Sequence, residues 1–310
     1  MLFISRYIAG FVMLALLLGC EDPVNLDLRD TPAELVVVSK FSPGQPVVVQ
    51  VSRTRTPLST EDSLDVDNAT VELYQEYRLL EVLELVPGND KIAPYYTTRV
   101  FTPAINIPYT IKVKAPDYKE VTAMSSIPVQ TEIRALQLSN LAVTPISGSR
   151  LNYQYNVSIT FEDPVEQQNF YHLNFYQQIL EYRLINNDTI ITREGLQRIQ
   201  FSSEVNDNSL TAYFQGGVLL EDKFINGNQV SYSFPLQVNI DPRRELIGKM
   251  FAELRSVSEE YYLFHNSLSR QQTSSNGPLN EPVIIYDNIE NGQGIFAGYN
   301  TALDSVVIRR

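Results

Sequence analysis

Short segments in which apolar and polar side chains alternate constrain the fold of this chain more than any other feature. The segment 109–114 reads YTIKVK, and its apolar side chains Tyr109, Ile111 and Val113 fall at every second position. A half-buried β-strand has this period of two, because successive side chains point to opposite faces of a sheet. The segment 156–161, NVSITF, alternates in the same way. We therefore expect a mainly β protein.

Seven segments of this kind lie between residues 33 and 128, and no helical pattern interrupts them. They are AELVVVSKF (33–41), PVVVQVSRT (46–54), ATVELYQ (69–75), YRLLEVLELV (77–86), YYTTRVF (95–101), YTIKVKAP (109–116) and EVTAMSSIP (120–128). This density of short strands predicts an N-terminal β-sandwich of immunoglobulin-like architecture over residues 33–128. Only the architecture is implied, since the chain has no tryptophan and one cysteine, and so lacks the Cys…Trp…Cys core of antibody domains.

Residues 129–310 are expected to form a second β-sandwich domain with one α-helix packed on it. The turn signal at residues 186–188 and the pair Asn226-Gly227 both predict hairpins. The sequence thus divides into two β-sandwich domains that follow a short N-terminal segment.

The helix is predicted over about residues 257–272. Its apolar positions Val257, Tyr261, Phe264 and Leu268 are spaced so that they form one stripe on a helix. Ser256 and Glu259 have the spacing of a capping box, which predicts where the helix begins.

A cluster of glycines at 292, 294 and 298 lies in NIENGQGIFAGYN, residues 288–300. The spacing is one residue longer than that of a dinucleotide-binding loop, and a strand-like segment follows where that fingerprint requires a helix. We expect the preceding segment PVIIYDNI to be a strand, Asn291-Gly292 to be a tight turn, and GIFAGY to be the next strand. Gly294 and Gly298 are then positions of close backbone approach or of a bulge.

Residues 1–19 have the pattern of a signal peptide. The apolar run from Tyr7 to Leu18 is shorter than the roughly 20 residues that span a bilayer, and it fits the central region of an export signal. The residues Leu17-Leu18-Gly19-Cys20 resemble a bacterial lipobox, which implies that Cys20 is acylated, begins the mature chain and anchors it in the outer membrane. The alternative is an ordinary signal peptide followed by a buried cysteine.

Residues 20–32 are expected to be the acylated cysteine and a tether, because the segment is polar and contains two prolines. Glu21 and Asp22 resemble the export signal of Bacteroidota lipoproteins that reach the outer face of the outer membrane. They favour display at the cell surface over the periplasmic face. The alternative is a solvated acidic start to a flexible tether.

The mature chain is acidic. Without residues 1–20 it has 23 basic and 36 acidic side chains, which leaves a net charge of −13. Nucleic-acid binding depends on basic side chains that neutralise phosphates, and docking on an anionic membrane surface depends on a basic patch. The charge therefore argues against both kinds of partner.

Residue types for catalysis or metal binding are few. The chain has two histidines, His172 and His265, whereas a zinc site usually takes three or four histidine, cysteine or carboxylate ligands. The motifs HExxH, GxSxG and GxxxxGK[ST] are absent from the sequence. We therefore predict no catalytic residue, no metal site and no cofactor, and we expect that the protein is not an enzyme.

Tyrosines are the residues with which we expect a partner or a ligand to make contact, if they are exposed. The candidates are Tyr171, Tyr176, Tyr261 and Tyr262. Packing in a core or at an edge strand is the alternative role for each.

Several longer motifs resemble one family over nearly the whole mature chain. They are EDP with NFYHLNFY, then LLEDKFINGNQ, SVSEEYYLFHNSL and EPVIIYDNIENGQGIFAGYN. Their order and spacing are similar to those of the domain-of-unknown-function family numbered 4249, DUF4249, which consists of Bacteroidota outer-membrane lipoproteins. The family often pairs an asparagine-proline-phenylalanine with the later EPV, and this chain reads NGPLNEPV there.

Members of that family tend to be encoded beside TonB-dependent outer-membrane transporters. The resemblance therefore implies a non-catalytic accessory subunit of such a β-barrel, which acts as a lid, captures a ligand or stabilises the barrel. Two alternatives stay open: a structural envelope lipoprotein, and a lipoprotein that degrades glycans or peptides.

Overall fold

The structure is a computed structural model that describes residues 32–56, 63–146, 148–165, 167–186, 188–199, 210–213, 215–274 and 283–308. The chain divides into a small unit of residues 1–32 and 55–60 and a large unit of residues 33–54 and 61–310. Every strand and helix named below belongs to the large unit. The mainly β, sandwich-like fold that the alternation predicts is confirmed.

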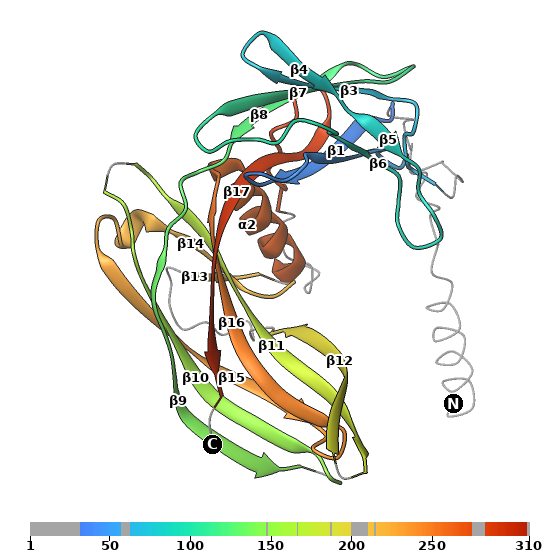
Figure 1. The fold of residues 1–310 in the computed structure, drawn as a ribbon. Coiled ribbons are helices and arrows are strands. Elements are labelled where there is room, and N and C mark those ends of the chain that lie inside the picture. Colours follow the sequence, from blue (N-terminus) through green and yellow to red (C-terminus); the bar gives the residue numbers. More distant parts are fainter. Residues whose placement is uncertain are drawn as a thin grey trace, which may run out of the picture. The chain divides into compact units, whose positions relative to one another are not determined.

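The N-terminal strands form two facing layers (Figure 1). One layer contains β1 (Leu35–Phe41), β2 (Val48–Arg53), β6 (Tyr95–Thr97) and β5 (Glu84–Val86), and the other contains β4 (Arg78–Val82), β3 (Thr70–Gln75), β7 (Pro108–Lys114) and β8 (Val121–Ser126). Tyr109, Ile111 and Val113 are buried between them, as the alternation predicts. The expected single strand 77–86 is wrong, because β4 and β5 belong to different layers and the chain crosses between them at the buried Leu83.

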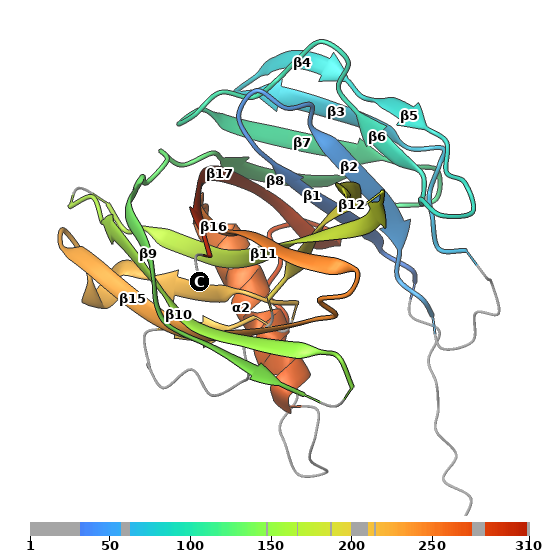
Figure 2. The same ribbon diagram turned by 60° about the horizontal axis from the view of Figure 1, so that its bottom comes forward.

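In the second sandwich, a three-stranded sheet packs against a longer sheet (Figure 2). The three-stranded sheet is β15 (Gln229–Ile240), β10 (Leu151–Glu162) and β9 (Ile133–Pro145). The longer sheet runs through β13 (Leu210–Ala212), β14 (Val218–Glu221), β11 (Phe170–Ile185), β16 (Glu245–Val257) and β17 (Gln293–Val307), with β12 (Asp188–Arg198) also paired to β11. Val157, Ile159 and Phe161 point into the core between the sheets.

The last strand joins the two sandwiches. Strand β17 pairs with β16 along Tyr299–Val307 and with β1, in parallel, along Gln293–Gly298. Its Phe296 stacks on Phe41 in the N-terminal core, at 4.6 Å between ring centroids. The longer sheet of the second sandwich therefore continues into β1 and β2.

Of the two predicted hairpins, the structure confirms one. Strands β11 and β12 form the hairpin at 186–188, with Ile185 opposite Asp188. The hairpin at Asn226-Gly227 is wrong, because a short 3₁₀-helix (η1, Asp222–Phe224) precedes this turn and β15 pairs with β10 instead. The Gly227 N–H donates to the Asp163 carboxylate at 3.2 Å, so the turn is held by the end of β10.

Helix α2 (Glu259–Ser274) lies on the longer sheet, against β11 and β17 (Figure 1). The predicted start at Ser256 is wrong, because β16 continues to Val257 and the Ser256 hydroxyl accepts a hydrogen bond from the Thr131 N–H. Ser258 caps the helix instead: its carbonyl accepts from the Tyr262 N–H at 3.1 Å and its hydroxyl from the Tyr261 N–H at 3.4 Å.

The glycine cluster has partly the predicted structure. The expected strand PVIIYDNI is wrong: residues 283–289 form no strand, and Glu290 makes a single bridge to Thr122. The close approach expected at Gly294 and Gly298 is confirmed, because a Cβ at these positions would collide with the backbone of Val37 and of Ser126, respectively.

Candidate functional site

The residues predicted to carry the lipid anchor and the export signal, Cys20, Glu21 and Asp22, lie outside the described residues. Within the described part of the chain, no helix is long and apolar enough to cross a membrane.

The four tyrosines considered for ligand contact lie on or beside α2 and β11. Tyr171 and Tyr261 are fully buried and Tyr262 is 8 % exposed, so their rings pack inside the protein. Tyr262 stacks on Phe170 at 4.9 Å between ring centroids. Tyr176 is half-buried, and the Arg198 guanidinium donates to its hydroxyl at 2.9 Å. Packing is therefore the role that the geometry supports for Tyr171, Tyr261 and Tyr262.

Three of the motifs that carry the family resemblance, EDP, NFYHLNFY and LLEDKFINGNQ, meet in space at one end of β11. The Asp163 carboxylate, at the end of β10, accepts from the Tyr171 hydroxyl in β11, and the Tyr171 hydroxyl accepts from Thr131. The Asp222 carboxylate accepts from the Asn169 N–H at 2.7 Å. The short motifs thus supply the contacts that hold β10, β11 and the turn before β15 together.

A buried polar cluster lies between α2 and the sheet, and we call it the histidine junction. It consists of His172, Tyr213, Arg255, Tyr261 and His265. The Nδ1 atom of His172 is 3.0 Å from the Tyr261 hydroxyl, and that of His265 is 2.9 Å from the Tyr213 hydroxyl. The two imidazole rings lie 6.3 Å apart, so each histidine bonds a tyrosine and no direct pair forms.

Arg255 links the histidine junction to a carboxylate. It donates to the Tyr261 hydroxyl at 3.3 Å and to Glu253 at 2.9 Å, and its guanidinium lies 4.9 Å from the centre of the Tyr299 ring. Arg255 therefore connects the contact between Tyr261 and His172 to the Glu253 carboxylate.

Both histidines are held neutral. Burial, with Arg255 and the second histidine as further causes, holds the pKa of His172 well below its usual value. Burial, with the charges of Lys40 and Arg255, lowers the pKa of His265 to about 3. An imidazole whose pKa lies far below neutral pH and which solvent does not reach is a weak general base.

The histidine junction has more polar atoms than partners for them. Three of its buried side-chain atoms have no hydrogen-bond partner in the described part of the chain: Nε2 of His172, Nε2 of His265 and Nε of Arg255. Among the described residues, no group of three or more histidine, cysteine or carboxylate side chains is placed to hold a metal ion. The hydrogen bonds between His172 and Tyr261 and between His265 and Tyr213 link α2 to the sheet.

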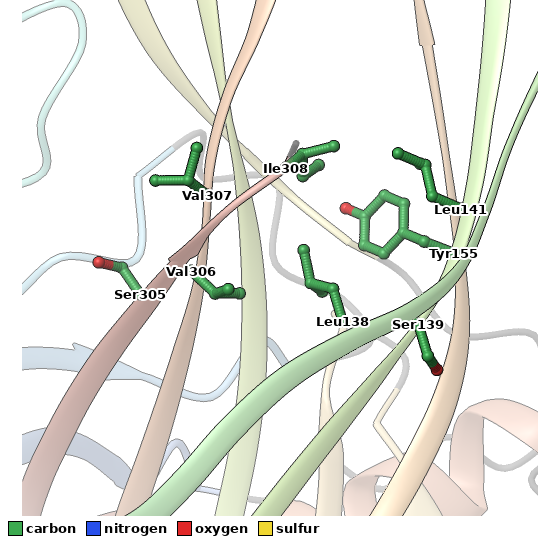
Figure 3. Close-up of a pocket in the computed structure, with 8 residues that line it drawn as sticks. All are labelled: Leu138, Ser139, Leu141, Tyr155, Ser305, Val306, Val307 and Ile308. Atoms are coloured by element: carbon green, nitrogen blue, oxygen red, sulfur yellow. The ribbon is translucent and has the colours of Figure 1, made fainter. Parts of the chain in front are cut away.

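A pocket with mainly apolar side chains opens between β9, β10 and the end of β17 (Figure 3). Its volume is about 410 Å³, which is within the range of small-ligand sites. The side chains of Leu138, Leu141, Tyr155, Val306 and Ile308 point toward its centre. The Tyr155 hydroxyl donates to Gln177 at 2.7 Å, so the polar group of this tyrosine is already paired.

The outer face of the longer sheet carries exposed aliphatic side chains among polar ones where α2 does not cover it. Its members share one side of the sheet, because directly paired residues and every second residue of a strand point the same way. We call it the aliphatic face, and it consists of Leu184, Ile191, Leu196, Leu246, Leu303 and Val307. These side chains are 39–64 % exposed. Polar side chains share this face, because Lys249 pairs with Val307, Glu253 with Leu303 and Gln178 with Leu196. Exposed aliphatic side chains in this number on one side of a sheet are nevertheless unusual for a face that meets water.

Sequence reasoning missed the histidine junction, the pocket and the aliphatic face. One available signal was the spacing of four between Tyr261, His265 and Ser269, which are three of the buried residues in the described part of α2. A second was the run of apolar side chains on both sides of the 186–188 turn, since a half-buried strand would have had polar residues on one face.

Comparison with known proteins gives one family and weak similarities to solved structures. The family model described as Domain of unknown function (DUF4249) matches residues 21–304. No curated protein matches the chain.

Among solved structures, the chain is similar to the three N-terminal domains of the highly immunogenic outer capsid protein (Hoc) of bacteriophage RB49. The identity is 14 % and the TM-score is 0.21, over 73 % of this chain and 64 % of that chain. The match thus covers less than two thirds of that structure, and at this TM-score it carries no argument about function.

Proposed function

Since the chain belongs to the DUF4249 family, we propose that it is a surface-displayed, lipid-anchored protein of the outer membrane that serves a TonB-dependent transporter as a non-catalytic accessory or ligand-capture subunit. The lipobox-like residues before Cys20, and Glu21 and Asp22 after it, support the anchor and the surface display. The partner is proposed from what the family resemblance implies and from the surface described next.

The aliphatic face is the observation that carries the proposal. Strand faces that meet water normally present polar side chains, and here six aliphatic side chains on one side of the sheet are 39–64 % exposed. A stable interface buries about 800 Å² on each partner, and its fully buried core is more apolar than the rest of a protein surface. A partner protein that covers these side chains therefore explains the surface better than permanent contact with water does.

The histidine junction supports a non-catalytic role. Both imidazoles are buried and neutral, and their hydrogen bonds go to tyrosines of the same chain. A hydrolase that used either histidine as a base would need it within reach of a substrate and with a pKa near the working pH. The alternative of a glycan- or peptide-degrading lipoprotein therefore has no support from these two residues.

Co-purification tests the proposal directly. We expect the full chain, recovered with a C-terminal tag from outer membranes in mild detergent, to bring down a large β-barrel protein. The variant Leu196→Lys places a charge on the aliphatic face and should reduce recovery of the barrel at least tenfold. That factor corresponds to about 1.4 kcal/mol, which is within the range for a central interface side chain.

The matched control is Leu79→Lys, which puts the same charge on an exposed strand residue of the other sandwich, where Leu79 is 45 % exposed. This variant should retain the barrel at the wild-type level. Recovery of the wild-type chain as a free lipoprotein would contradict the proposal and favour a structural envelope protein. Protease treatment of intact cells tests surface display separately: an outward chain is cleaved, and a periplasmic one is protected.

A further inference from the structure

Three positively charged side chains converge on the face of the longer sheet that carries α2. We call them the cation cluster, and they are Lys40, Arg198 and Arg255. Arg198, at the end of β12, donates to the Tyr176 hydroxyl at 2.9 Å, and this hydroxyl donates to the Glu253 carboxylate at 3.1 Å. Arg255 donates to the other oxygen of Glu253 at 2.9 Å. The two arginines therefore meet at one carboxylate.

Lys40 reaches the same place from β1. Val38 packs against the apolar residues around α2, and Lys40, two residues further along the strand, points to the same side. Lys40 is exposed to solvent, but the groups around it remove enough of its hydration to lower its pKa, and the positive charges of Arg255 and Arg198 lower it further. The ammonium group of Lys40 therefore lies close to both arginines.

The positive charge of the cation cluster is only partly compensated by the described residues around it. Glu253 accepts from Arg255 and also from the side chains of Asn174 and Tyr176, so its oxygens are already in use. In the part of the chain that the structure describes, Lys40 and Arg198 form no ion pair, and the Lys40 ammonium has no hydrogen-bond partner. Like charges held close together are unfavourable unless a counter-ion lies among them. In a chain with a net charge of −12, such a site points to an anion from outside the chain.

We propose that the cation cluster binds an oxyanion, the carboxylate or phosphate group of a soluble ligand, between the Lys40 ammonium and the Arg198 guanidinium. Both groups have N–H donors to spare, because the described hydrogen bonds of Arg198 use two of its donors and those of Lys40 use none. Ammonium and guanidinium groups hold carboxylates and phosphates by charge-assisted hydrogen bonds. Both terminal nitrogens of Arg255 already have partners, so Arg255 contributes its charge. The proposal goes beyond the transporter role and does not depend on it.

Isothermal titration calorimetry on the full chain, in nanodiscs of zwitterionic lipid and a chloride buffer, tests the proposal. The probes are inorganic phosphate and succinate, and the neutral control is succinamide. We expect saturable binding of at least one of the two anions and no binding of succinamide. Binding of phosphate alone would assign a phosphate ligand, and binding of succinate alone would assign a carboxylate. Binding of neither anion, or equal binding of succinamide, would overturn the proposal.

Substitutions locate the site. Lys40→Gln and Arg198→Gln should each weaken anion binding by about tenfold, because each removes one charge-assisted contact. Lys40→Arg keeps the charge and should bind nearly as the wild type does, which separates the loss of charge from a loss of packing. The matched control is Lys249→Gln, at an exposed lysine of β16, which should leave binding unchanged. Equal weakening by Lys249→Gln and Lys40→Gln, or by both variants of Lys40, would also overturn the proposal.

Discussion

His172 and His265 sit where a positive charge is disfavoured, and this has a consequence for stability. Burial is the main cause in both cases, and the cations Arg255 and Lys40 add to it. The folded protein therefore binds fewer protons at these histidines than the unfolded chain, whose histidines titrate near pH 6.5. A group with a depressed pKa in the folded state contributes stability that is lost as the pH falls.

We predict that the free energy of unfolding decreases as the pH falls from about 6.5 toward about 5, at up to about 1.4 kcal/mol per pH unit for each histidine. Urea titrations at several pH values measure it. The variant His265→Gln removes one of the two groups and should reduce the slope by about half. The predicted pH range ends at about 5. Burial raises the pKa of Asp163, and an acid with a raised pKa in the folded state increases the free energy of unfolding as it takes up its proton, which opposes the effect of the histidines. An unchanged slope in the variant would contradict the assignment of the pH dependence to the two histidines.

A substitution at Gly298 tests how closely β17 approaches the end of β8. A Cβ at residue 298 would collide with the carbonyl of Ser126, and neither of the two backbones can give way freely. We predict that Gly298→Ala destabilises the fold by about 1–3 kcal/mol, as overpacking does, measured by chemical denaturation. Gly195→Ala is the control: its nearest neighbour would be 4.0 Å away, so its effect should be small or stabilising. Equal effects at both sites would contradict the geometry.

The burial of individual side chains was predictable where the alternation along a strand determines which of them face the core. Tyr109, Ile111 and Val113 are inside as expected, because a half-buried strand has two distinct faces. The pairing of His172 with Tyr261 was not predictable, since 89 positions separate them and the contact depends on how α2 lies on β11. A tertiary contact of that kind leaves no local pattern in the sequence.

The start of helix α2 depends on where the preceding strand, β16, ends. Two serines, Ser256 and Ser258, precede the helix, and both are capping residues by type. Ser256 is already used in β16, where it accepts from the Thr131 N–H, so the cap falls to Ser258. The capping-box spacing pointed to the wrong serine because the sequence does not reveal that β16 extends to Val257.

We predict that Ser258→Ala lowers the stability of the fold by about 1 kcal/mol through loss of the cap, and that Ser258→Asn, which keeps a side-chain acceptor, restores most of it. Thermal or urea denaturation measures both variants. Equal losses in the alanine and asparagine variants would show that the hydroxyl matters for its contact with Ser125, at 3.2 Å, and not for the cap.

Turn chemistry predicted where turns occur better than which strands they join. Asn226-Gly227 is a turn, but η1 precedes it and β15 pairs with β10, which is distant along the chain. Likewise, Asn291-Gly292 makes a turn with no strand before it. Which strands pair is decided by the sheets as they assemble, and a dipeptide carries no information about that.

At the scale of the whole molecule, β17 is the strand on which both sandwiches depend. Its parallel pairing with β1 joins the two ends of the described chain. Nothing in the segment QGIFAGYN separates a strand that closes one sandwich from a strand shared by two. The mainly β fold was therefore predictable from alternation, whereas the continuous sheet across both sandwiches was not.

The aliphatic face is also a property of the assembled sheet. Its members come from β11, β12, β16 and β17, and they become neighbours only when these strands pair. The account of function depends on this surface being the site where a transporter binds.

Photo-crosslinking in intact cells tests that claim most directly. A photoreactive amino acid in place of Leu196 lies on the aliphatic face, and one in place of Leu79 lies on the other sandwich, at a similarly exposed strand position. We predict an adduct with a large outer-membrane β-barrel protein from position 196 and none from position 79. No adduct from position 196, or equal adducts from both positions, would contradict the account.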